Sequence, residues 1–196
     1  TPVTKALEKQ GTPVLVSGPW VSAVETWCGG RLTMAQASQA FFLPQVLKTE
    51  RLPALLRAFL ATLRTVDAAS GAKYRDIQAA EFEYPGSCIK DRIFVTQKEA
   101  GALTRADERP QSSLFAFARA RPVALLNPKH MFAQKLAAIH ETRPGLAAFL
   151  CLKVLHLHDG TVPPEQEGEY CNLAENVELK VLKRALRLDV AMGRKP

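Results

Sequence analysis

The sequence has no long hydrophobic run and no closely paired cysteines. Its longest apolar stretch covers residues 146–152, far short of the roughly 20 residues that a membrane-spanning helix needs. Its four cysteines include no C-x-x-C pair, and a chain long enough to bury a core does not need a disulfide framework. We therefore expect a soluble protein of the reducing cytoplasm that makes no contact with a membrane.

Motifs for catalysis and cofactor binding are absent as well. Neither of the phosphate-binding patterns G-x-G-x-x-G and G-x-x-x-x-G-K-S/T occurs, and Ser17 lacks the G-x-S-x-G spacing of a hydrolase nucleophile. His156 and His158 are two positions apart, which on a helix places them on nearly opposite faces and argues against a shared metal ion. His130 is positioned to bond backbone at a helix start. We expect no catalytic, cofactor-binding or metal-binding residue, and no enzymatic activity from this chain.

The chain is basic, but its charges are not focused. It carries 26 basic and 19 acidic residues, for a net charge of +7. The densest basic stretch, in residues 180–195, follows an acidic stretch in residues 165–178, and this order along a helix is the one that the helix dipole favours. A solvated helix face therefore explains most of the charge, and we do not expect nucleic-acid binding. A basic nucleic-acid-binding module is kept as the alternative function.

Residues 1–45 are predicted to form a small α/β unit. A polar helix over residues 3–10 precedes a short run at residues 13–16 whose β-branched side chains predict a strand. Apolar residues at helical spacing then predict a second helix over residues 21–28, and residues 31–45 form a connector. A hydrolase built on the strand would need a general base that the sequence does not offer.

Residues 46–196 are predicted to form a second, larger domain. Residues 52–66 place apolar side chains at i, i+3, i+4 and i+7, which predicts an amphipathic helix. Two extended runs, residues 75–84 and 88–97, flank a Pro-Gly pair. A Pro-Gly pair between two such runs indicates a tight turn, so we expect an antiparallel hairpin.

A third strand, over residues 122–126, leads into the helical end of the chain. Asn127 is predicted to cap the next helix and Pro128 to begin it. Helices are expected over residues 128–140, residues 144–158 and, roughly, residues 165–190. The predicted fold class is therefore α+β: the small α/β unit, a helix, a three-stranded, mostly antiparallel sheet and a C-terminal helical bundle.

The last two helices carry more apolar surface than one chain can cover. The helix at residues 144–158 holds a single charged side chain, Lys153. The apolar stripe of the final helix spans about half of its circumference, which exceeds the stripe of about 100° that one core usually takes up. A homodimer that makes a four-helix bundle is the commonest solution. The predicted interface residues are Phe149, Leu150, Val154, Leu157, Leu173, Val177, Val181 and Leu182.

This order of elements resembles the back half of the heat-shock protein 90 chaperones, of the bacterial HtpG type. The most specific match is Leu-Leu-Asn-Pro-Lys-His at residues 125–130, followed by Gln-Lys-Leu at residues 134–136, which is close to that family's turn from strand to helix. Residues 7–16, with the helix that follows them, look like the end of the family's middle domain. On this resemblance, residues 1–45 close the middle domain and residues 46–196 form the C-terminal dimerisation domain.

The resemblance implies a molecular chaperone that acts in protein folding and the stress response. The family's ATP site and the arginine that assists hydrolysis lie in parts that this chain does not include, so the chain alone is expected to be non-catalytic. Its expected partners are a second copy of itself and unfolded or partly folded client proteins. The insertion at residues 98–121 is longer than the usual connection of about 4 to 6 residues, and we expect it to be mobile. Its apolar residues Leu114, Phe115 and Phe117 are the predicted client contacts.

Overall fold

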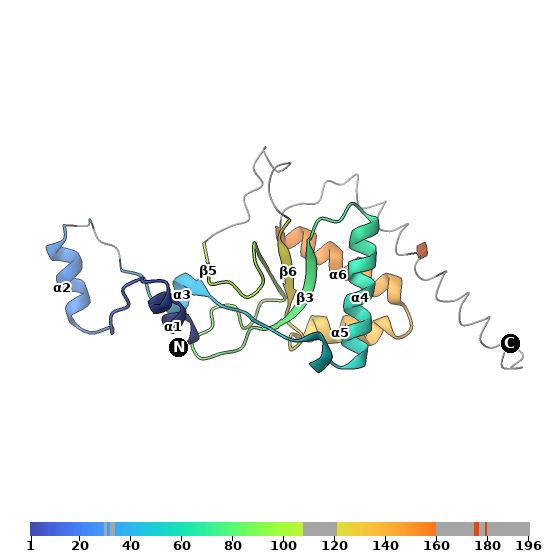
Figure 1. The fold of residues 1–196 in the computed structure, drawn as a ribbon, viewed down its shortest axis with the longest axis horizontal. Helices are drawn as coiled ribbons and strands as arrows, with labels where there is room; N and C mark the ends of the chain where they lie inside the picture. The colour runs from blue at the N-terminus through green and yellow to red at the C-terminus, as the bar shows by residue number, and fades with distance from the viewer. Residues whose placement is uncertain (30, 32–33, 108–120, 160–174, 177–178, 180–196) are drawn as a thin grey trace, which may run out of the picture.

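The computed structural model describes residues 1–29, 31, 34–107, 121–159, 175–176 and 179. In this part of the chain the fold is α+β, as the sequence predicts, with helices packed on one face of a sheet (Figure 1). The sheet has four strands rather than the predicted three, because the short strand at Gln45–Val46, in the predicted connector, joins its edge. The elements in chain order are α1 (Pro2–Lys9), α2 (Trp20–Trp27), α3 (Ala37–Ala40), β1 (Phe41–Phe42), β2 (Gln45–Val46), the 3-10 helix η1 (Thr49–Arg51), α4 (Ala54–Ala69), β3 (Asp76–Glu81), β4 (Phe94–Gln97), β5 (Thr104–Arg105), β6 (Val123–Leu126), α5 (Met131–His140) and α6 (Pro144–Asp159).

The larger sheet has the strand order β2-β3-β6-β4. β3 and β6 are parallel, with Ile77 opposite Ala124, whereas β4 is antiparallel to β6, with Val95 opposite Leu125. β2 is antiparallel to β3. Every residue of β6 is buried, which is typical of a strand that lies inside a sheet and is covered on both faces.

The antiparallel hairpin predicted from residues 75–84 and 88–97 is wrong. β3 and β4 lie on either side of β6 and do not pair with each other. The chain does turn at Pro85 and Gly86, but three consecutive charged residues at positions 90–92 follow, and β4 begins only at Phe94. Charged side chains are costly to bury inside a sheet, so the unbroken apolar run of β6 takes the position next to β3.

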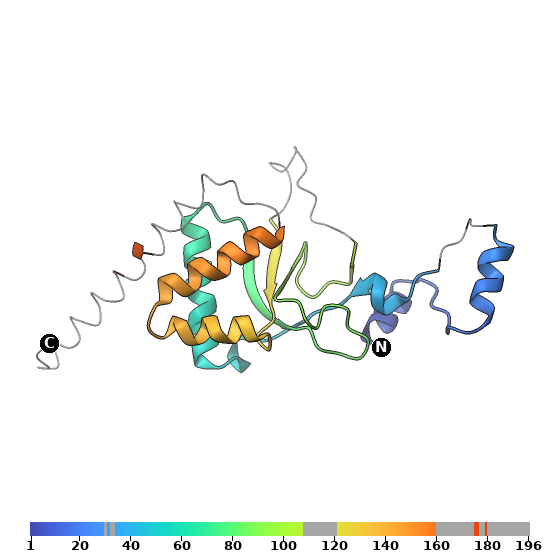
Figure 2. The ribbon, with the colours of Figure 1, turned by 180° about the vertical axis from the view of Figure 1, so that it is seen from behind.

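One face of this sheet is covered by α4, α5 and α6 (Figures 1 and 2). The helix predicted at residues 52–66 is confirmed as α4, which begins after Pro53 and runs on to Ala69. Its side chains Phe59 and Leu63 are both 0 % exposed. Full burial of one such side chain stabilises a fold by about 1.5 to 3 kcal/mol, so the apolar stripe read from the sequence anchors α4 to the core.

The opposite face of the sheet is covered by shorter segments. Phe42, Phe82 and Ile89 are buried there against Val95 and Leu125. Phe42 belongs to β1, which pairs antiparallel with β5. A two-stranded ribbon and loops, rather than helices, therefore complete this second side of the core.

The N-terminal helix α1 packs against residues from much later in the chain. Val3 and Leu7 are buried against Tyr84. The Tyr84 hydroxyl oxygen accepts a hydrogen bond from the Leu43 N–H at 2.9 Å. The division of the chain at residue 45 stays a prediction, and these contacts join residues from both sides of it.

The strand predicted at residues 13–16 does not form. This stretch is neither helical nor paired with a strand, and Leu15 and Val16 are 63 % and 87 % exposed. β-branched residues favour a strand only where a neighbouring strand takes up their backbone hydrogen bonds, and the described residues place no such strand beside them. α2, the helix predicted at residues 21–28, follows with no buried residue and projects from the rest of the molecule (Figure 1).

Two of the three predicted C-terminal helices lie among the described residues. α6 confirms the helix predicted at residues 144–158, and α5 covers most of residues 128–140. The final helix, predicted at residues 165–190, lies mostly outside the described residues. No helix in the described part of the chain has the length and apolar character needed to cross a membrane.

Candidate functional site

The turn from β6 to α5 carries the most specific motif of the sequence, and Asn127 holds it. The Asn127 side chain is 3 % exposed. Its amide nitrogen donates to the carbonyl oxygens of Lys90 at 3.1 Å and Arg92 at 3.2 Å, and its amide oxygen accepts from the Lys129 N–H at 3.1 Å. Asn127 thus joins the segment that leads into β4 to the turn that follows β6.

The prediction that Asn127 caps a helix beginning at Pro128 is wrong. α5 begins at Met131, and its cap is His130, whose Nδ1 accepts a hydrogen bond from the Phe132 N–H at 3.1 Å. The predicted backbone bond of His130 at a helix start is therefore confirmed. Asn127 does not cap because its amide bonds carbonyl groups more than thirty positions earlier in the chain, partners that the local sequence does not reveal.

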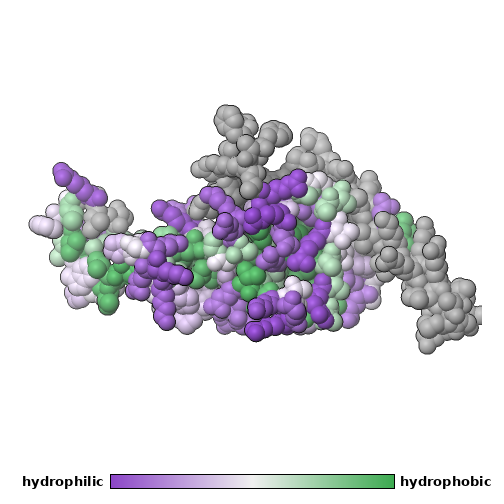
Figure 3. All heavy atoms as spheres, in the orientation of Figure 1, coloured by the Kyte–Doolittle hydropathy of each residue, from purple (hydrophilic) through white to green (hydrophobic). Residues whose placement is uncertain are grey.

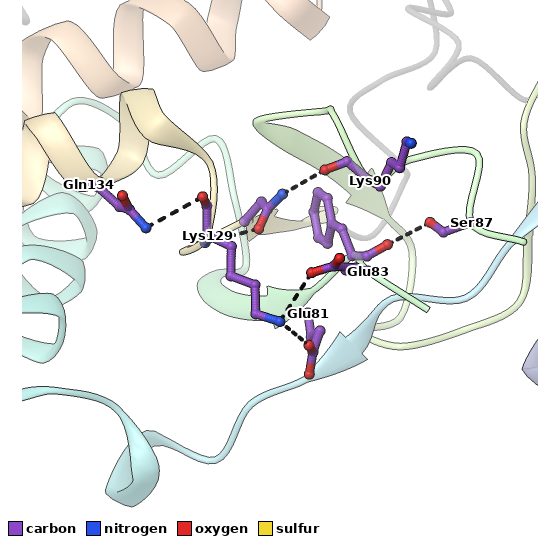
Figure 4. Close-up of polar contacts among 8 residues, drawn as sticks. Glu81, Glu83, Ser87, Lys90, Lys129 and Gln134 are labelled. Atoms are coloured by element: carbon purple, nitrogen blue, oxygen red, sulfur yellow. Dashed lines mark hydrogen bonds and ion pairs between the residues drawn. The ribbon is translucent and has the colours of Figure 1, made fainter. Parts of the chain in front are cut away.

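Lys129 continues from this turn onto the surface, where it meets the end of β3 (Figure 4). Its ammonium group pairs with the Glu81 carboxylate and lies 3.3 Å from an oxygen of Glu83. Hydrogen bonds to these carboxylates, chiefly to Glu81, raise the pKa of Lys129. The Lys129 side chain is 56 % exposed, and exposed ion pairs contribute little to stability. The turn therefore connects β3, β4 and α5, and the hydrogen bonds of the buried Asn127 amide contribute most to this connection.

α6 has apolar side chains on both its inner and its outer side. On the inner side, core residues that include Cys151 and Leu155 pack with α4 and α5, and burial raises the pKa of the Cys151 thiol. At about 100° of rotation per residue, the predicted interface residues of this helix fall on the opposite side. These residues are Phe149, Leu150 and Val154, which are half-buried and still pack against the margin of the core, and Leu157, which is 64 % exposed.

The one charged residue of this outer side lies against its aromatic ring. The Lys153 ammonium nitrogen is 5.8 Å from the ring centroid of Phe149, within the range of a cation–π contact. The remaining predicted interface residues, Leu173, Val177, Val181 and Leu182, lie outside the described residues. The structure therefore brings four of the predicted interface residues together on α6.

A cluster of buried polar groups at the end of α4 was missed by the sequence reasoning. Asp67, 3 % exposed, accepts hydrogen bonds from the N–H groups of Lys73 and Tyr74, each at 3.3 Å. Burial raises the pKa of Asp67, against the lowering effect of these hydrogen bonds. His156 of α6 stacks on Tyr74, with ring centroids 5.9 Å apart. Burial, with the nearby Lys73 charge as the second cause, lowers the pKa of His156 to about 4.

The position of Asp67 offered a signal for this cluster. Asp67 is four residues after Leu63 and therefore lies on the apolar stripe of α4. A carboxylate on such a stripe must find hydrogen-bond donors when it is buried, and the turn that follows α4 supplies them. The cluster fastens the turn between α4 and β3 to α6.

The predicted client contacts Leu114, Phe115 and Phe117 lie outside the described residues. The segment that leads toward them is held by Gln97, whose amide nitrogen donates to the Ala102 carbonyl at 2.7 Å. The Gln97 amide oxygen accepts from the Gly101 N–H at 2.9 Å, and β5 then pairs with β1. Residues 98–105 thus make regular contacts in the structure, and the mobility of residues 98–121 stays a prediction.

Among the described residues, no group of three or more His, Cys, Asp or Glu side chains is placed to hold a metal ion. No protein-family model matches the chain, and neither do curated proteins or solved structures. The resemblance to the heat-shock protein 90 chaperones therefore stays a prediction from the residues of the chain.

Proposed function

We propose that the chain is the C-terminal dimerisation and client-contact portion of a heat-shock protein 90-like molecular chaperone, without catalytic activity of its own. The observation that carries the proposal is the outer side of α6. There Leu157 is 64 % exposed, and Phe149, Leu150 and Val154 pack against the margin of the core but stay only partly buried. The family is proposed because residues 125–130 resemble the turn from strand to helix of the heat-shock protein 90 chaperones.

A helix that is apolar on all sides is normally covered on all sides. Within the described part of the chain, α4 and α5 cover the inner side of α6, and the outer side is left for a further partner. A second copy of the chain is the simplest partner, because a two-fold axis lets the same apolar face serve both subunits. The pairing of two such helical ends would give the four-helix bundle predicted from the sequence.

A binding role for the molecule, rather than a chemical one, is also supported by its N-terminal side. Leu15, Val16 and Trp27 are 63 %, 87 % and 87 % exposed, and apolar surface gathers around α2 in the space-filling view (Figure 3). Grouped exposed apolar side chains commonly mark surfaces that bind other proteins. Leu114, Phe115 and Phe117 remain the proposed client contacts.

Light scattering on two matched aspartate variants tests the proposal. In Leu157→Asp the new charge stands on the outer side of α6, where it is exposed in one chain but buried unpaired in a dimer. Ala61→Asp adds the same charge at an exposed position of α4. We expect the dimer mass for the parent and for Ala61→Asp, and the monomer mass for Leu157→Asp. A dimer that persists in Leu157→Asp would contradict an interface on this side of α6.

A further inference from the structure

A groove of about 580 Å³ lies beside β3, where β2 ends and the chain turns away into η1 and α4. Three leucines lie along it; Leu47 is half-buried, whereas Leu52 and Leu60 are core residues only 7 % and 1 % exposed. Its polar lining includes the exposed residues Lys48 and Glu50. The connection from β2 to α4 passes along this edge of the sheet (Figure 1). The groove is therefore bounded by an open sheet edge on one side and by α4 on the other.

The backbone at this edge has the pattern of a strand that lacks a neighbour. The Ala79 carbonyl accepts from the Leu47 N–H at 2.9 Å, so the backbone groups of Ala79 face β2. Because these groups alternate in direction along a strand, those of Ile77 face the same side, beyond the end of β2. The Ile77 N–H donates to Asp76 Oδ1 at 2.7 Å, and the Ile77 carbonyl accepts from Arg64 Nε at 2.9 Å.

Two side chains thus occupy the donor and the acceptor that a neighbouring strand would use. Arg64 Nε and Asp76 Oδ1 are also 2.7 Å apart, and their side chains are 37 % and 35 % exposed. Because both side chains are partly exposed, they have room to turn toward solvent; Asp76 Oδ2 also accepts a hydrogen bond from Gln78 Nε2 at 2.7 Å. An edge masked by charged side chains is one way in which proteins prevent unwanted strand pairing.

We propose that this groove binds an extended peptide segment, which adds to β3 in line with β2 and replaces Asp76 and Arg64 at Ile77. One peptide residue in the β conformation supplies the acceptor and the donor that Ile77 requires, and strand addition of this kind is a common mode of peptide recognition. Of the three leucines only Leu47 is exposed enough to contact the peptide, so backbone hydrogen bonds carry most of the binding. The charged lining residues are two of each sign, which favours a peptide over an anion. The site shares no lining residue with α6, so it is independent of the proposed dimerisation.

The test uses the full chain, labelled with 15N, and two capped peptides of alternating valine and threonine with a terminal lysine. In the second peptide, every backbone nitrogen that would face β3 is methylated, which removes its hydrogen-bond donors and leaves its side chains unchanged. We expect saturable binding of the first peptide, with shifts of the Ile77 amide and Arg64 Nε resonances. The methylated peptide should bind at least about tenfold more weakly, because it loses backbone hydrogen bonds. Equal affinity of the two peptides, shifts confined to other residues, or no saturable binding would overturn the proposal.

Variants of the lining give a second measurement. Arg64→Met keeps a long apolar stem and frees the Ile77 carbonyl, so the first peptide should bind about fivefold more tightly, as expected when a single competing hydrogen bond is removed. Arg57→Met makes the same change at an exposed position of α4 away from the groove and should leave affinity unchanged. Thr49→Trp should fill the groove and abolish binding. Peptide affinity that is the same in the parent, Arg64→Met and Thr49→Trp, with melting temperatures preserved, would place the peptide elsewhere.

Discussion

Acid should destabilise the fold through His156. The side chain is 2 % exposed, and burial, aided by the Lys73 charge, lowers its pKa from 6.5 to about 4. The folded state therefore binds a proton less readily than the unfolded chain does. Stability is full above a pH near 6.5 and is lost as the pH falls toward 4. Linkage puts the loss between pH 7.5 and pH 4.5 at about 2.5 kcal/mol.

Burial also shifts the pKa values of His140 and Asp67, and comparison of variants separates their effects from that of His156. Burial also lowers the pKa of His140, which adds to the loss in acid. Burial raises the pKa of Asp67, so Asp67 acts in the opposite sense: its contribution is present at low pH and is lost as the pH rises through its folded pKa. A variant that removes only His156 leaves both of these contributions in place.

The assay is urea unfolding of the parent, His156→Gln and His140→Gln at pH 7.5 and pH 4.5. We expect the parent to lose more free energy of unfolding on acidification than His156→Gln does, by about 2.5 kcal/mol. His140→Gln should stay closer to the parent, because His140 is only partly buried. If the parent and His156→Gln lose the same free energy on acidification, the ring of His156 is not held neutral by burial.

Three further outcomes are expected. Asn127→Ala should cost about 2 to 3 kcal/mol of unfolding free energy in urea, because the carbonyls of Lys90 and Arg92 lose their donors; a loss below half of that would show that water replaces the amide. Phe59→Ala should cost about 3 to 5 kcal/mol by the same measurement, through the cavity that it leaves. A gel shift with duplex DNA at physiological salt should be blank, whereas micromolar binding with a steep salt slope would favour the basic nucleic-acid-binding module.

The long helices α4 and α6 were predictable from the sequence because their pattern is local, whereas the short α3 lies in the stretch predicted as a connector. In α4, Phe59 and Leu63 are one turn apart and share one buried face, so spacing alone identifies the helix and its core side. α6 was equally clear from its nearly unbroken apolar composition. The same composition also indicated that its outer side needs cover, although the sequence does not show which residues pack inward.

The sheet was less predictable because its pairing is not local. The turn at Pro85 and Gly86 exists, yet the strand beside β3 is β6, which comes much later in the chain. Asparagine is a common helix cap, but the Asn127 amide nitrogen donates hydrogen bonds to carbonyl groups that are distant in the sequence. The run at residues 13–16 has strand composition without a neighbouring strand among the described residues. In each case the deciding partner is far away in the sequence.

The central claim is that the outer side of α6 pairs two copies of the chain. Sedimentation equilibrium of the unmodified chain, over a hundredfold range of concentration, tests it most directly. We expect a mass twice that of the 21.5 kDa chain, with dissociation at most at the lowest concentrations. A mass of one chain throughout this range would contradict it.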